Sequence, residues 1–350
     1  MIDAGLVGFG FAGKTFHAPV IRATEGLRLA AILQRTGSDA AQRYPDARLV
    51  RSMDELLSIE SIRLIVIATP NTSHYALARQ SLVAGRDVVI DKPFATSYSE
   101  AAELLALARK NERLLSVYQN RSWDGDFLTV QQLLGSERLG RIVLFESHFD
   151  RFRPNPREQA WRERPEPGSG LLFDLGPHLI DQALLLFGKP KEISADVRIE
   201  REGALVDDAF DVVFHYPKMR AALRASVLAS TQTPRFALHG TRGGYLKHGL
   251  DPQEDALKRG ETPDREDWGA EPPERWGTLV TLEGEKLTSE PYPTLCGNYR
   301  KFYENVRDAM LGTAPLAVTP ERALEVMRAL ELATQSSRRG CKVAWQGDPN

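Results

Sequence analysis

The chain has 350 residues, of which 42% are hydrophobic and 26% are charged, and this length predicts about two domains. Its 45 basic residues nearly balance its 47 acidic ones, which argues against nucleic acid or an anionic membrane as a partner. We find no signal-peptide pattern, no apolar run of membrane-spanning length, and no disulfide or metal spacing around Cys296 and Cys341. We therefore expect a cytoplasmic protein without a bound metal.

From the start to about residue 120, short apolar runs alternate with segments of helical period. Helices are predicted over residues 72–84 and 97–110, each with Ser or Thr near its start. The apolar runs are continuous and β-branched, which is typical of buried parallel strands. The first closes with residues 6–7, and the others lie near residues 29–33, 64–68, 88–90 and 114–118. This alternation predicts an α/β Rossmann domain with a doubly wound parallel sheet over residues 1–120.

After residue 121 the pattern changes to consecutive strands joined by short turns. Strand-like runs lie near residues 142–149, 192–199, 209–214, 219–228 and 235–238, and helices near 124–134, after 174, and over 298–310 and 319–334. Such a pattern predicts a second α/β domain over residues 121–350, with an open, mainly antiparallel sheet and helices on one face. The alternative for the final helices is that they pack on the first domain. The charged, Pro-rich stretch 251–276 is predicted to be a surface excursion.

The first candidate site is the glycine motif Gly8-Phe-Gly10-Phe11-Ala-Gly13, directly after the first strand. Its glycines would form a tight turn, let the backbone approach a pyrophosphate, and bring the next helix close to the strand. We therefore predict dinucleotide binding here; the alternative is a glycine-rich turn without a ligand. Pro19 is expected to end or kink the following helix.

The end of the second strand decides between the two nicotinamide cofactors. An NAD-binding chain usually presents an acidic residue there, but the strand ends in Gln34-Arg35-Thr36. Arg35 can clamp a 2′-phosphate and Thr36 offers a hydroxyl, so we predict NADP over NAD. The alternative is that Arg35 is an ordinary loop arginine.

Two further strands end in polar residues where a doubly wound sheet binds its ligand. The loop after the third predicted strand contains four candidate cofactor contacts: Thr69, Pro70, Asn71 and His74. The alternative for Thr72, in the same loop, is that it is the N-cap of the next helix. The fourth strand ends in Asp91-Lys92-Pro93. Proline keeps the preceding lysine out of helical geometry, and a lysine there can stabilise a developing alkoxide. The alternative is a surface lysine.

In the second half, Asp174, His178 and Asp181 share one face of a predicted helix. A carboxylate one turn from a histidine can orient the ring and stabilise its protonated form. The alternatives are that Asp174 is an N-cap and that His178 is a buried core residue. The chain has no HExxH motif or third ligand at a spacing suited to zinc.

Taken together, the glycine motif, Asp91-Lys92-Pro93 and Asp174-Leu-Gly-Pro-His178-Leu-Ile-Asp181 resemble the three signatures of the Gfo/Idh/MocA oxidoreductase family. Further segments, including Lys14-Thr-Phe-His-Ala-Pro19, are similar to its NADP-dependent scyllo-inositol dehydrogenase branch. The resemblance implies that Lys92 holds the reacting oxygen and touches the nicotinamide ribose, that His178 is the general acid/base, and that Asp174 orients it or contacts substrate. It also implies cofactor contacts for Lys14, Trp161 and Arg162, and substrate contacts for Arg121, Trp123, Arg151 and Tyr299.

The resulting hypothesis is reversible hydride exchange between NADP and a secondary alcohol of a cyclitol or sugar, which makes a small polyol the expected partner. We also expect a homodimer or homotetramer formed through the outer face of the second sheet. The alternatives are a keto-sugar reductase, a redox-assisted elimination or hydrolysis, and a dinucleotide sensor without catalysis. Whether Lys92 or His178 transfers the proton stays open.

Overall fold

The structure, a computed structural model, describes residues 1–157 and 160–345. Contacts between residues divide the chain into two compact units, each made of several stretches. Unit 1 comprises Met1–Trp123, Gln253–Trp268 and Asn298–Met327; unit 2 comprises Asp124–Pro252, Gly269–Gly297 and the chain from Arg328 onward. The chain therefore leaves unit 1 and returns to it twice.

Unit 1 contains a six-stranded, fully parallel sheet of order β3-β2-β1-β4-β5-β6. The strands are β1 (Ile2–Val7), β2 (Leu27–Leu33), β3 (Arg48–Val50), β4 (Ile62–Ile67), β5 (Asp87–Ile90) and β6 (Leu115–Val117). The apolar runs are buried as predicted, which confirms the doubly wound parallel sheet. Strand β3 was not predicted, because three residues carry no readable periodicity.

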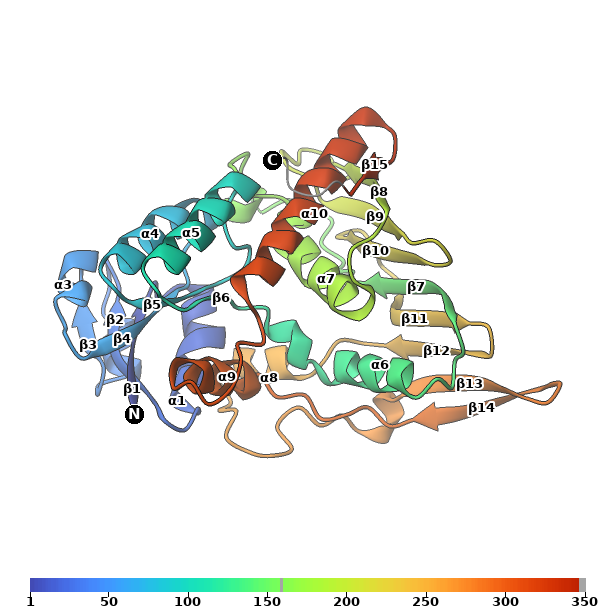
Figure 1. Cartoon of the computed structure of the whole chain (residues 1–350), viewed down its shortest axis with the longest axis horizontal. Helices are drawn as coiled ribbons and strands as arrows, with labels where there is room; N and C mark the ends of the chain where they lie inside the picture. The colour runs from blue at the N-terminus through green and yellow to red at the C-terminus, as the bar shows by residue number, and fades with distance from the viewer. Residues whose placement is uncertain (158–159, 346–350) are drawn as a thin grey trace. The chain divides into compact units, whose positions relative to one another are not determined.

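The helices of unit 1 lie on both faces of this sheet, with α4 and α5 on one face and α1 and α9 on the other (Figure 1). They are α1 (Ala18–Arg22), α2 (Asp39–Arg43), α3 (Met53–Leu57), α4 (His74–Val83), α5 (Tyr98–Lys110), α8 (Gln253–Lys258) and α9 (Arg300–Met310). Ser97 caps α5 by accepting a hydrogen bond from the Glu100 amide at 3.2 Å. The alternative of a Thr72 N-cap is wrong, because Asn71–Ser73 forms a 3-10 turn and Ser73 precedes α4.

Pro19 changes the type of helix rather than simply ending it. Residues Gly13–His17 form a π-helical turn, η1, which runs into α1 with Pro19 in its first turn. A proline ring clashes with the carbonyl four residues earlier in a regular α-helix. The wider π turn relieves that clash, and the helix ends at Arg22, three residues after the proline.

Unit 2 contains a nine-stranded sheet of order β14-β13-β12-β11-β7-β10-β9-β8-β15. Every neighbouring pair is antiparallel except β7 and β10, so the predicted open, mainly antiparallel sheet is confirmed. The strands are β7 (Ile142–His148), β8 (Glu192–Arg198), β9 (Ala209–His215), β10 (Arg220–Ser226), β11 (Pro234–Gly240), β12 (Gly243–His248), β13 (Gly277–Glu283), β14 (Lys286–Tyr292) and β15 (Val343–Ala344).

Two helices, α6 (Gly125–Gly135) and α7 (Leu171–Phe187), cover one face of this sheet (Figure 1). The apolar core lies beneath them, where Phe127 of α6 meets Phe236 of β11 with ring centroids 6.4 Å apart. The last helix, α10 (Pro320–Arg339), begins in unit 1 and ends in unit 2.

One alternative and one prediction for this half of the chain need correction. Helix α7 begins three residues before Asp174, and Gly170 is its N-cap, so Asp174 lies in the first turn and does not cap the helix. The stretch 251–276 is a surface excursion only in part. Residues 258–262 and 264–267 are exposed, but Leu257 and Trp268 are buried in the core of unit 1 and Glu271 is buried in unit 2. The high charge and proline content of this stretch gave no indication in the sequence of these few buried residues.

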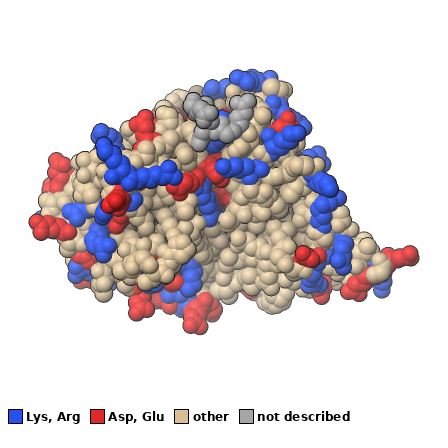
Figure 2. Space-filling model, viewed as in Figure 1, with Lys and Arg blue, Asp and Glu red and all other residues tan. Residues whose placement is uncertain are grey.

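Basic and acidic side chains are interspersed on the visible face, without a continuous basic patch (Figure 2). This distribution offers no electrostatic footprint for nucleic acid on that face. In the described part of the chain, no helix combines the length and the apolar content that crossing a bilayer requires.

Candidate functional site

The glycine turn lies at the carboxyl end of β1, and its three glycines have different reasons to be glycine. Gly8 has φ +97°, and a Cβ there would lie 2.6 Å from the Ala68 carbonyl oxygen. A Cβ on Gly13 would lie 2.1 Å from the Gly8 carbonyl oxygen. A Cβ on Gly10 would meet no protein atom within 4 Å. The fold therefore requires Gly8 and Gly13, whereas the open space at Gly10 fits the close approach of a pyrophosphate.

Side chains beside this turn are arranged around the end of β2. Lys14 forms an ion pair with Asp39, and Gln34 donates a hydrogen bond to the same carboxylate. The Lys14 and Gln34 contacts hold the pKa of Asp39 below its ordinary value. Phe11 is 57% exposed, so its ring is available to a ligand. We predicted no acid at this tip; Asp39 supplies one, and Lys14 neutralises it.

Arg35 and Thr36 are exposed beyond the end of β2, as a contact to a 2′-phosphate requires. Arg51, which was not predicted, donates hydrogen bonds to the carbonyl oxygens of Gln34 at 2.7 Å and Gly37 at 2.6 Å. It is also exposed, and it holds the loop that carries Arg35. The sequence does not indicate this role of Arg51, because Arg51 follows the short strand β3 and has no characteristic spacing from the glycine motif.

The loop after β4 contains the next group of predicted cofactor contacts. Thr69 accepts a hydrogen bond from Ser73 at 2.7 Å, Pro70 is exposed, and Asn71 is buried. His74 is fully buried, with its ring nitrogens 2.9 Å from the Pro93 carbonyl oxygen and 3.0 Å from that of Thr69. The His74 ring thus joins the loops after β4 and β5, and its direct contact with a cofactor stays a prediction.

Lys92 follows β5, and the residue before it is tied into a buried polar cluster. The carboxylate of Asp91 accepts a hydrogen bond from the Lys92 amide at 3.0 Å and lies 3.6 Å from His17 Nε2. His17 Nδ1 in turn lies 2.6 Å from the Tyr303 hydroxyl of α9. Burial raises the pKa of Asp91, but its contact with His17 outweighs this and holds the pKa below the ordinary value. The cluster fixes the backbone from which the Lys92 side chain extends.

In unit 2 the first turns of α7 present the predicted acid and base. His178 is buried at 5% exposure, one turn after Asp174. The Asp174 carboxylate lies 3.1 Å from Arg162 Nε and 3.7 Å from Arg151 Nη1. Trp161 and Arg162 stack, with the guanidinium 4.4 Å from the ring centroid. The structure thus brings Asp174 together with Arg151 and Arg162, two residues that we assigned separately to substrate and cofactor.

Asp207, which was not predicted, holds the start of α7. Its carboxylate accepts a hydrogen bond from the Leu172 amide at 2.7 Å, and its carbonyl oxygen accepts one from Leu171 at 2.8 Å. Gly170 has φ +88°, and a Cβ there would lie 2.0 Å from the Asp207 carboxylate. Burial raises the pKa of Asp207 to about 6. A residue more than thirty positions later in the sequence therefore caps the helix, and no local pattern indicates it.

Three predicted substrate contacts lie in unit 1 in strongly buried surroundings. Arg121 is 5% exposed and pairs with Glu254 of α8. Trp123 packs against Phe302 with ring centroids 5.8 Å apart, and Tyr299 is fully buried in the same core. Substrate contact by these residues stays a prediction.

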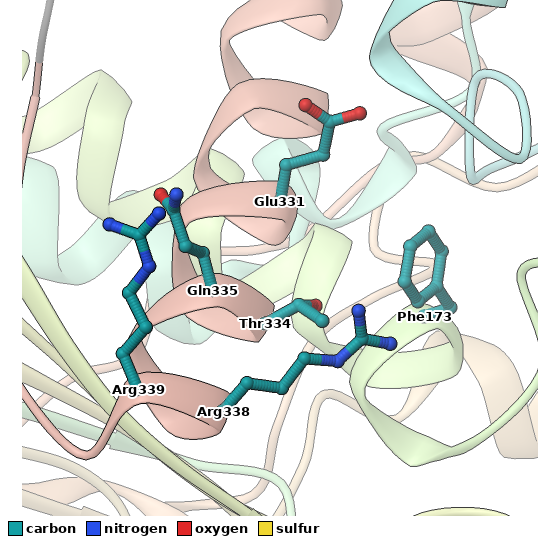
Figure 3. A pocket seen from close by; sticks show the side chains of 6 residues that line it. All are labelled: Phe173, Glu331, Thr334, Gln335, Arg338 and Arg339. Atoms are coloured by element: carbon teal, nitrogen blue, oxygen red, sulfur yellow. The ribbon is translucent and has the colours of Figure 1, made fainter.

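The described residues offer no metal site, and a large hollow among them contains none of the predicted site residues. Within residues 1–157 and 160–345, no group of three or more His, Cys, Asp or Glu side chains could hold a metal ion. A hollow of about 400 Å³ lies between α7 and α10 in unit 2 (Figure 3). It contains none of the predicted site residues and is lined by Phe173, Glu331, Thr334, Gln335, Arg338 and Arg339.

A parallel sheet of this strand order, with a glycine turn open at Gly10, defines a dinucleotide-binding protein. The chain also contains Lys92, Asp174 and His178, whose side chains are suited to proton transfer and to the stabilisation of a developing negative charge. These features fit an NAD(P)-binding oxidoreductase.

Comparison with known proteins names the family. Residues 2–119 match the family model of the oxidoreductase NAD-binding Rossmann fold, and residues 131–344 match that of the oxidoreductase C-terminal alpha/beta domain. The chain belongs to the Gfo/Idh/MocA oxidoreductase family.

Relatives match the chain over nearly its whole length. It is 44% identical to the uncharacterised oxidoreductase YdgJ of Escherichia coli, over 96% of each chain. It is 34% identical to IolW of Bacillus subtilis, a scyllo-inositol 2-dehydrogenase (NADP(+)), over 96% of this chain and 94% of IolW. The solved structure of an oxidoreductase from Bacillus cereus is 32% identical, with a TM-score of 0.91 and full coverage of both chains.

Proposed function

We propose that this oxidoreductase exchanges hydride between NADP and a secondary alcohol of a cyclitol or sugar. The observation that carries the proposal is the placement of Lys92 after β5, at the same sheet edge as the glycine turn after β1. In a parallel sheet this edge is where a dinucleotide binds. The name of the relative IolW supports both the cofactor and the polyol.

In the proposed oxidation, each of the candidate catalytic residues has a separate role. The bound cofactor supplies the acceptor for the hydride that leaves the carbinol carbon. His178 accepts the proton of the reacting hydroxyl, because a neutral imidazole is a suitable base near neutral pH. The ammonium group of Lys92 stabilises the oxygen as negative charge develops on it. Asp174 and its two arginines orient the substrate. The carbinol becomes a ketone, and the same groups act in reverse for reduction.

The preference for NADP rests on the two exposed arginines at the end of β2. Arg35 offers a planar guanidinium to a 2′-phosphate, and Arg51 holds its loop. Arg35→Ser is expected to lower kcat/KM with NADP by about 10- to 100-fold, while kcat/KM with NAD changes little. Arg63→Ser is the control, because Arg63 is exposed at the opposite end of β4. Equal losses with both cofactors would contradict the assignment of Arg35.

The reaction itself is tested by following NADPH formation on a panel of inositols and aldoses, with NAD in parallel. Turnover of a cyclitol or sugar with NADP is the expected result. Turnover with NAD alone would remove the cofactor preference and leave the reaction class. Tight cofactor binding without turnover of any polyol or reduction of any keto-sugar would contradict the proposal and favour a dinucleotide sensor.

A further inference from the structure

An arginine-rich pocket surrounds the first turn of α7 in unit 2. It combines residues from the loop after β7, from the turn at 161–163 and from the strand connections near residues 201 and 207. Its charged lining comprises five arginines and four carboxylates: Arg151, Arg153, Arg157, Arg162, Arg201, Glu163, Asp174, Asp207 and Asp208. Positive groups thus outnumber negative ones beside Asp174, which we place in the catalytic site.

Each carboxylate already has a function within the pocket. Asp174 is shared by Arg151 and Arg162, as described above. Glu163 pairs with Arg157 at 2.8 Å and with Arg201 at 3.2 Å. Asp208 pairs with Arg201 at 2.9 Å. The fourth carboxylate, Asp207, caps α7 through the Leu172 amide, and burial raises its pKa to about 6.

Arg153 is the arginine for which no carboxylate remains. Among residues 1–157 and 160–345, none lies within ion-pair distance of its half-buried guanidinium. Burial and the charges of Arg151 and Arg157 lower the pKa of Arg153 below its ordinary value, and the more distant charges of Asp174 and Glu163 offset this only in part. A partly buried cation among like charges is unfavourable unless an anion binds beside it and neutralises its charge.

The pocket is narrow, with a volume of about 30 Å³. Whole small-molecule sites usually occupy about 300–1,000 Å³, so this space suits one substituent of a ligand rather than a sugar ring. The planar guanidinium groups of Arg151, Arg153 and Arg162 match the oxygens of a carboxylate or phosphate. Asp174, which pairs with two of them, lies one helical turn from His178.

We propose that this pocket binds an anionic substituent of the substrate, a carboxylate or phosphate, so that the preferred substrate is a sugar acid or a phosphorylated cyclitol rather than a neutral polyol. The inference rests on the proposed function for the reacting carbinol. Arg153 is the specificity-determining residue, and it acts on the anionic substituent without touching the reacting atoms.

The test compares matched neutral and acidic substrates: glucose with glucuronate, and myo-inositol with myo-inositol 1-phosphate. The wild-type protein is expected to have about 10- to 100-fold higher kcat/KM for the acidic member of at least one pair. The pair that shows the difference distinguishes carboxylate from phosphate. Arg153→Gln should remove this preference and leave kcat/KM for the neutral member nearly unchanged, and Arg153→Lys should retain part of it.

Two controls separate binding from folding. Arg198→Gln changes an arginine on β8 that pairs with Asp211 at the surface, and it should leave the preference intact. Arg153→Gln should also keep or raise the thermal unfolding temperature, because it removes a positive charge that lies beside Arg151 and Arg157 and has no ion-pair partner among the described residues. A structural arginine would lower that temperature when replaced.

Failure of the inference is distinguishable from failure of the proposed function. If neutral and acidic members react equally and Arg153→Gln affects neither, the anionic site is refuted and the dehydrogenase proposal stands. If no substrate reacts, the proposed function fails, and the site is judged by thermal shift. Stabilisation by glucuronate or by myo-inositol 1-phosphate that is lost in Arg153→Gln would then support the site, and no shift with either would refute it.

Discussion

The candidate site residues of unit 1 and those of unit 2 are held by different kinds of structure. In unit 1 the ligand-facing edge is mainly backbone: a glycine turn with open space at Gly10, strand ends, and loops held by buried side chains such as His74. In unit 2 the candidate residues are mainly charged side chains, with Asp174 between Arg151 and Arg162. A backbone site suits a cofactor that many proteins share, whereas a side-chain site can change its substrate by single substitutions.

The difference extends to how polar groups are compensated. Buried polar residues of unit 1 contact one another, as Asp91 and His17 do with 3.6 Å between a carboxylate oxygen and Nε2. The pocket of unit 2 leaves Arg153 without an ion-pair partner among the described residues. We interpret the contacts in unit 1 as holding a fixed geometry. We interpret the arginine without an ion-pair partner in unit 2 as part of a site for a charged ligand. The following predictions test this contrast in order of decreasing effect.

The largest effect is expected at Lys92, the side chain of unit 1 that we assign to the reaction itself. Lys92→Met should lower kcat by about 10³-fold, because the methionine side chain cannot stabilise a developing negative charge. The affinity for NADP should change little, since the backbone supplies most of that site. Steady-state turnover and a titration of cofactor fluorescence measure the two quantities.

Lys110→Met, at the exposed end of α5, is the matched control and should behave as wild type. Near-normal turnover in Lys92→Met would contradict the assignment of this residue.

The second prediction concerns two glycines of the same motif. Gly13→Ala forces a methyl group against the Gly8 carbonyl oxygen and should lower the free energy of unfolding by about 3 kcal/mol. Gly10→Ala meets no protein atom, so stability should be unchanged or slightly higher, while the affinity for NADP should fall at least about 10-fold. Urea denaturation and cofactor titration on both variants measure these effects. If Gly10→Ala bound NADP normally, the open space at Gly10 would not be where the pyrophosphate lies.

The same contrast explains how much could be read from the sequence. The parallel sheet of unit 1 was predictable because each buried strand is a continuous apolar run, and the glycine motif marks the turn that follows β1. Strand β3 was missed because it has three residues. Arg51 was missed with it, since this arginine reaches the loop after β2 only through the fold.

In unit 2 the sequence indicated the residues of α7 but not their surroundings. The i, i+4 spacing places Asp174 and His178 on one helical face whatever the tertiary structure. The start of that helix depends on Asp207, and the charge around Asp174 depends on loops that precede it in the sequence. Contacts of this kind leave no periodic pattern. The arginine pocket therefore became visible only in the structure.

The third prediction tests whether Asp207 is merely a cap or also a source of pH dependence in unit 2. Burial raises the pKa of Asp207 from 3.8 to about 6, so the folded state holds its proton more tightly than the unfolded state. The stabilisation from this group is complete below pH 4 and is lost as the pH rises through about 6, with a limit of about 3 kcal/mol.

Asp207→Asn should abolish this dependence, because the amide stays neutral while its oxygen still accepts the hydrogen bond from the Leu172 amide. Urea denaturation of both proteins at pH 4, 5, 6 and 7 measures the difference in free energy of unfolding, and effects of other carboxylates cancel in it. We expect the variant to gain relative to wild type between pH 4 and pH 7. A relative loss would show that the N-terminus of α7 favours the charged carboxylate more than burial opposes it. In that case Asp207 would count as a full anion in the arginine pocket, and the excess positive charge that we assign to a substrate group would be smaller.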